Sequence, residues 1–64
     1  MKWSDTYDIA IELAEKFPDE DPTYIRFTDL REKVINLEGF NDNPEHSGEK
    51  LLEAIQMAWL EEIS

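Results

Sequence analysis

The chain has 64 residues, of which 16 are Asp or Glu and 6 are Lys or Arg, so its formal net charge is −10. This length allows one domain, residues 1–64, with a small core. The absence of cysteine excludes a disulfide scaffold, a thiolate metal site and a Cys nucleophile. The acidity disfavours nucleic acids and anionic membranes and favours cationic partners. No apolar run is long enough to span a bilayer, which predicts a cytoplasmic protein.

A first helix is predicted over residues 5–16, with Ser4 as its N-cap. Pro18 ends it, because the residue before a proline is disfavoured in the α conformation. The apolar side chains expected to face the core are Tyr7, Ile9, Ala10, Ile11, Leu13, Ala14 and, just beyond, Phe17. The remaining arc carries a row of carboxylates at offsets of three and four: Asp5, Asp8, Glu12 and Glu15.

An acidic, turn-rich link joins this helix to a second one. Residues 23–27 are predicted to be an extended piece or one short turn, and the second helix to run from residue 28 or 29 to 38. Thr28 is its candidate N-cap and Gly39 its C′ residue. Arg26 is a candidate partner of Asp29 or Asp21 in a surface ion pair. The expected buried face consists of Leu30, Val34 and Leu37.

The third helix is predicted to start at Pro44, after an Asn43 cap, or at Gly48, after a Ser47 cap, and to end near residue 62. Its expected core face consists of Leu51, Leu52, Ile55, Ala58, Trp59 and Ile63. Met57 and Leu60 fall on other sides, so they belong either to a broad buried stripe or to an exposed apolar contact for a partner. Trp3 and Trp59 are expected in the core.

Three short helices with a brief extended piece indicate an all-α fold: a compact three-helix domain of the winged-helix or helix-turn-helix type. Such domains usually bind DNA through the second helix. Here that helix carries three acids and two bases, which is the wrong balance for phosphate contacts. The fold is therefore expected without the DNA-binding function.

Catalysis is not expected. The single histidine, His46, has no nucleophile at a recognisable spacing and is expected to be an exposed turn residue. Paired carboxylates could act as acid and base only in a pocket that separates their pKa values, and a small helical domain has little material for one.

The carboxylate row has two interpretations. Its members repel one another by a few tenths of a kcal/mol per adjacent pair, and Asp19, Glu20 and Asp21 follow at the negative end of the helix dipole. The row is either a solubilising face or a surface for a divalent cation or a basic partner. No EF-hand spacing occurs, and oxygen ligands alone do not select one metal.

Several short motifs extend over essentially the whole chain. They are Lys2-Trp3-Ser4-Asp5, Phe17-Pro18-Asp19-Glu20-Asp21-Pro22, Arg26-Phe27-Thr28-Asp29-Leu30, Leu37-Glu38-Gly39-Phe40, Glu49-Lys50-Leu51-Leu52-Glu53-Ala54-Ile55 and Trp59-Leu60. In this order and spacing the chain resembles the IscX family, the small acidic accessory proteins of bacterial iron–sulfur cluster assembly.

The resemblance implies a helical, winged-helix-like protein that is not an enzyme. It implies binding to the positively charged surface of the pathway's cysteine desulfurase, weak binding of ferrous iron (Fe²⁺) by surface carboxylates, and overlap with frataxin on the desulfurase. Asp5, Asp19, Asp21 and Asp29 lie inside the matching motifs. Asp8, Glu12 and Glu15 do not, and are inferred from the carboxylate row alone.

We therefore expect a monomeric adaptor or regulator of iron–sulfur cluster assembly. The candidate metal-binding residues are Asp5, Asp8, Glu12, Glu15, Asp19 and Asp21. The candidate partner-binding residues are Asp5, Asp8, Glu12, Asp19 and Asp29. The alternative from another class is an acidic DNA mimic that inhibits a nucleic-acid-binding protein. A DNA-binding winged helix and a dedicated metal buffer are the remaining, less favoured readings.

Overall fold

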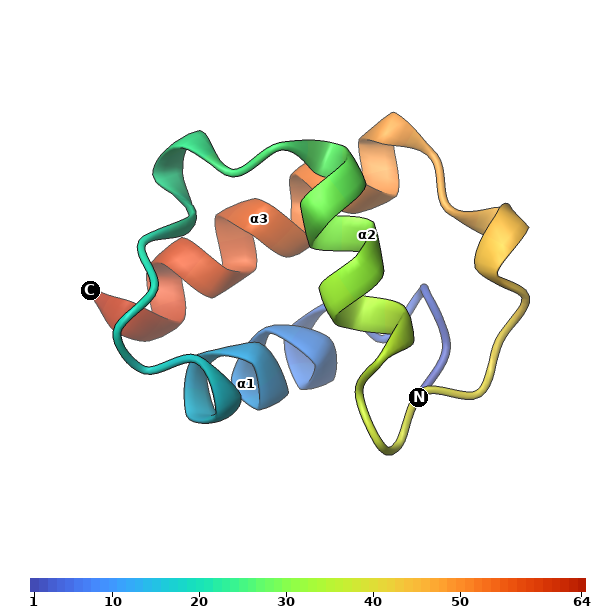
Figure 1. The fold of residues 1–64 in the computed structure, drawn as a ribbon, viewed down its shortest axis with the longest axis horizontal. Coiled ribbons are helices and arrows are strands. Elements are labelled where there is room, and N and C mark those ends of the chain that lie inside the picture. The colour runs from blue at the N-terminus through green and yellow to red at the C-terminus, as the bar shows by residue number, and fades with distance from the viewer.

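The computed structural model describes residues 1–64, and three helices form most of it. Figure 1 shows α1 (Thr6–Lys16) along one edge, α3 (Glu49–Ile63) behind, and α2 (Phe27–Ile35) in front of α3 and beside the start of α1. Single 3₁₀ turns, η1 (Pro22–Tyr24) and η2 (Pro44–His46), lie in the two links. No residue is in a β-strand, so the predicted all-α three-helix class is confirmed and the domain has no β-hairpin wing. None of the helices is long and apolar enough to cross a membrane.

The core lies where the three helices meet the N-terminal segment. Trp3 and Trp59 are both buried, as predicted, and no polar or charged side chain is buried with them. The buried apolar residues are Trp3, Ile9, Ala10, Leu13, Leu30, Val34, Leu37, Leu52, Ile55, Ala58 and Trp59. Apart from Trp3 and Leu37, which lie outside the helices, these residues follow the predicted helical periodicity.

Two predictions for α1 were wrong: its N-cap residue and the extent of its buried face. Ser4 is not its cap: Asp5 occupies the N-cap position, and its carboxylate accepts a hydrogen bond from the Lys2 backbone N–H at 2.9 Å. Tyr7 and Ile11 were expected in the core but are 69% and 39% exposed. The buried face of α1 is narrower than its apolar arc, because its buried residues lie on one side of the helix and leave these two on the other.

The predicted boundaries of α2 are wrong by one to three residues. The helix starts at Phe27, after Arg26, so Thr28 is not its N-cap. It ends at Ile35, where the side chain of the C-cap residue, Asn36, donates a hydrogen bond to a helix carbonyl. Gly39 has no positive φ and is not a C′ residue. Successive tight turns follow the helix, and they let Leu37 reach the core from outside it.

The third helix follows the later of the two predicted starts. It begins at Glu49 after Gly48, with no side-chain cap from Ser47. The Asn43 side chain instead caps η2, accepting a hydrogen bond from the Glu45 backbone N–H at 2.9 Å. Ile63 was predicted to face the core and is 42% exposed, because it is the last residue of the helix.

The N-terminal segment is fixed against the second link. The Trp3 backbone N–H donates to the Asp42 carboxylate at 3.0 Å, and the Trp3 indole N–H donates to the Asn43 carbonyl at 2.8 Å. The Trp3 ring meets Phe40 edge-on at a centroid distance of 4.9 Å. This tertiary contact was not predicted, and it closes the core at the end where the chain begins.

Candidate docking surface

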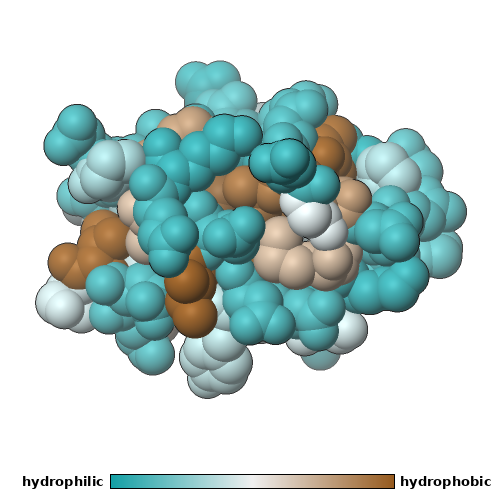
Figure 2. Space-filling view, turned by 90° about the horizontal axis from the view of Figure 1, so that it is seen from below, coloured by the Kyte–Doolittle hydropathy of each residue, from teal (hydrophilic) through white to brown (hydrophobic).

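The carboxylate of the α1 N-cap residue and three carboxylates on the helix form a surface that we call the acidic stripe: Asp5, Asp8, Glu12 and Glu15. The helix places them on neighbouring turns, because residues three and four apart share a face. Asp8, Glu12 and Glu15 are exposed, and Asp5 is half-buried. Figure 2 views the molecule from the side on which α1 lies in Figure 1, and hydrophobic areas interrupt a mostly hydrophilic surface there.

The acidic stripe has no internal counterion. The two ion pairs of the molecule join Arg31 to Glu45, at 3.4 Å, and Lys33 to Glu20, at 3.2 Å. Lys33 also lies over the Phe17 ring, at 4.2 Å from its centroid. The bases of α2 thus neutralise acids in the links and none on α1, which leaves the stripe available to an external cation. Neither of the two candidate ion pairs of Arg26 is formed.

The other predicted site residues lie off the stripe. Asp19 is exposed in the link that follows α1. Asp21 caps η1: its carboxylate accepts from the Thr23 hydroxyl and from the Thr23 backbone N–H, and these bonds lower the pKa of Asp21. Asp29 lies in the first turn of α2, which begins at the edge of the molecule opposite α1 (Figure 1). Asp29 is exposed there, and no ion pair joins it to another residue.

The predicted metal ligands do not form a cage. No three His, Asp or Glu side chains are grouped so that they could hold one ion. Asp21 is already engaged by Thr23, and Asp5 by the Lys2 backbone. A cation on α1 would therefore meet at most two neighbouring carboxylates, with water as its remaining ligands.

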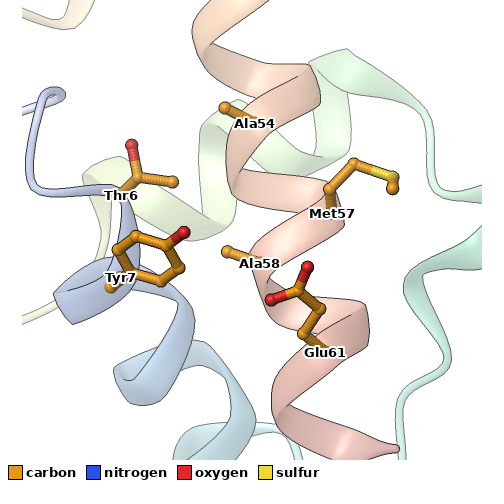
Figure 3. A pocket seen from close by; sticks show the side chains of 6 residues that line it. All are labelled: Thr6, Tyr7, Ala54, Met57, Ala58 and Glu61. Atoms are coloured by element: carbon orange, nitrogen blue, oxygen red, sulfur yellow. The ribbon is translucent and has the colours of Figure 1, made fainter.

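Sequence reasoning missed one feature of this side of the molecule. A groove lies between the first turn of α1 and the middle of α3, and four of its six lining residues are hydrophobic (Figure 3). The exposed Tyr7 and Met57 are among them. The exposure of Met57 agrees with the second of the two interpretations of this residue, an apolar contact on the surface.

The whole chain, residues 1–64, matches the family described as iron-sulphur cluster assembly. The chain belongs to this family, the IscX family. An uncharacterized protein of Pseudomonas aeruginosa is 55% identical to it over 62 residues, which cover 97% of this chain and 94% of the relative. Membership supports a role in iron–sulfur cluster assembly, and the similarity over nearly full length means that the relative shares the domain described above.

Proposed function

We propose that this chain is a non-enzymatic adaptor or regulator of iron–sulfur cluster assembly that docks its acidic stripe on a cysteine desulfurase. Family membership supports the pathway. The observation that carries the docking surface is the exposed row of carboxylates on α1, with no Lys or Arg within ion-pair distance of it. Like charges at this spacing cost a few tenths of a kcal/mol per pair, and a basic partner would offset that cost.

The charge of the whole chain would guide this association. At a net charge of −10, the chain is attracted to a basic surface over a distance set by the ionic strength. Fast, salt-sensitive binding is therefore expected. Frataxin, which is also acidic, would compete for the same basic surface of the desulfurase. Asp19, which follows the end of α1, and Asp29, in the first turn of α2, are both exposed and would extend the interface.

Weak binding of ferrous iron is the second part of the proposal. Asp8 and Glu12 are exposed and four residues apart, so they can share one hydrated ion. The absence of any three-ligand group fits loose, open coordination and not a tight iron centre. Because the ion would use the carboxylates that meet the desulfurase, ferrous iron is expected to weaken docking.

Titration of the cysteine desulfurase with this chain tests the proposal. Affinity is expected to fall at least about tenfold between about 0.1 M and about 1 M NaCl, where the Debye length shortens from roughly 10 Å to roughly 3 Å. At low salt, the affinity in the presence of ferrous ion should be lower than the affinity in its absence. Equal affinity at both salt concentrations would contradict the docking surface. A pull-down that recovered a nuclease or a repressor in place of the desulfurase would favour the DNA mimic.

A further inference from the structure

The groove between α1 and α3 has a volume of about 330 Å³ and lies open to solvent beside Tyr7 and Met57. Its lining residues are Thr6, Tyr7, Ala54, Met57, Ala58 and Glu61. Figure 3 shows Tyr7 leaning from α1 toward α3, with Ala54 and Ala58 one turn apart between the helices. These two side chains end at Cβ, so they leave a space between longer neighbours that no residue of the chain fills.

Exposed apolar residues of α1 connect the groove to the acidic stripe. Tyr7 and Ile11 are four residues apart and therefore neighbours on the helix surface, and both are exposed. Ile11 is in turn three residues from Asp8 and four from Glu15. The apolar surface thus continues from the groove, through Tyr7 and Ile11, to the carboxylates.

The charge around the groove restricts what can fill it. Glu61 lines the groove, and Asp8 adjoins Tyr7 in the sequence. A second copy of a chain with a net charge of −10 would be repelled, as would an acidic peptide. A segment that combines an apolar side chain with Lys or Arg fits both the lining and the surrounding charge.

We propose that the groove receives an apolar side chain from a basic segment of the desulfurase, while the basic side chains of that segment lie on the acidic stripe. This inference rests on the proposed function and adds an apolar anchor to it. The two contacts respond differently to salt. Ions screen the charged contact, whereas burial of apolar surface does not depend on screening.

Two groove variants test the anchor. Ala54→Gln places an uncharged polar side chain in the groove, and Met57→Ala removes part of its wall. Ala54 and Met57 are exposed on α3, and Ala and Gln are good helix formers, so both variants should keep the fold. Tyr24→Ala is the control, because Tyr24 is 94% exposed on η1 and does not line the groove.

Affinity for the desulfurase should be measured at about 0.1 M and about 1 M NaCl. We expect both groove variants to weaken binding about fivefold to thirtyfold at each salt concentration, with Tyr24→Ala unchanged. The double variant Asp8→Lys, Glu12→Lys should weaken binding chiefly at low salt. If both groove variants bound with wild-type affinity while the charge variant bound weakly, the apolar anchor would be contradicted and the proposed function would stand.

If the charge variant bound with wild-type affinity at low salt, the proposed function itself would be contradicted. Sedimentation that revealed a dimer abolished by Ala54→Gln would assign the groove to a second copy and also overturn the anchor.

Discussion

The outward face of α1 and the opposite side, formed by α2 and the second link, use carboxylates differently. On the second side Glu45 pairs with Arg31, and Asp42 accepts hydrogen bonds from two backbone N–H groups. On α1 the exposed carboxylates of the stripe pair with nothing, although Lys16 is on the same helix. The acids of the second side make contacts within the fold, whereas the exposed acids of the stripe, Asp8, Glu12 and Glu15, make no ion pair within it. This division is the reason to look outside the chain for the partner of α1.

The largest effect is expected where the N-terminal segment meets the second link. Trp3→Ala should lower the free energy of unfolding by about 3–5 kcal/mol, because it removes a buried indole from the core. Trp3→Phe keeps a ring beside Phe40 and loses the hydrogen bond to the Asn43 carbonyl, so it should cost less. Urea unfolding measures both. Near-wild-type stability of the Ala variant would show that this side does not hold the fold.

Acid should lower the stability of the contact between the N-terminal segment and the second link by protonating Asp42. Hydrogen bonds from the Trp3 backbone N–H and then from the Asn43 backbone N–H lower the pKa of Asp42 below its ordinary 3.8. Its contribution to stability is therefore complete above about pH 4 and is lost as the pH falls through the lowered folded-state pKa. Wild type should lose more stability than Asp42→Asn on acidification below pH 4, as followed by far-UV circular dichroism against urea. Equal losses of stability in wild type and Asp42→Asn would show that Asp42 does not cause the sensitivity to acid.

Neutralising one carboxylate of the stripe should stabilise the chain. Glu15 lies in the last turn of α1, near the negative end of the helix dipole, and three residues from Glu12. Glu15→Gln should raise the free energy of unfolding by about 0.5 kcal/mol, measured by urea unfolding at low ionic strength. A fall in stability would mean that the carboxylate has a partner within the fold.

The same substitution, Glu to Gln, on the side formed by α2 and the second link should lower the free energy of unfolding. Glu45→Gln breaks the ion pair with Arg31, in which the Glu45 side chain is 84% exposed. The free energy of unfolding should fall by about 0–1 kcal/mol, since exposed pairs contribute little. If Glu45→Gln instead stabilised the chain as Glu15→Gln is expected to, the acids of the two sides would not differ in their contribution to stability.

The periodicity of apolar residues and the positions of helix-breaking residues predicted most of the fold. The α1 end at Pro18 and the buried positions Leu30, Val34 and Ile55 follow from the spacing of apolar residues and from proline geometry. Tyr7 was misplaced because an apolar arc does not say which part of it the neighbouring helix will cover. The contact of Trp3 with Asp42 joins residues 39 positions apart, and no local rule reaches that far.

The candidate site was predictable from the sequence only in part. Helical spacing alone placed Asp8, Glu12 and Glu15 on one face. Their freedom from counterions required the structure, because Lys16 is within reach of Glu12 by sequence spacing and does not pair with it. The groove required the packing of α1 on α3, since Ala54 and Ala58 leave a space only in relation to residues of the other helix.

The proposed function requires that the stripe, unpaired within the fold, binds a cationic partner. The most direct test compares two double charge reversals at equal net charge and low salt: Asp8→Lys with Glu12→Lys on the stripe, and Glu32→Lys with Glu49→Lys on exposed positions of α2 and α3. Isothermal titration of the desulfurase should show at least about tenfold weaker binding for the stripe variant than for the control variant. Equal affinities of the two variants would mean that net charge alone guides the encounter, and would contradict a docking surface on α1.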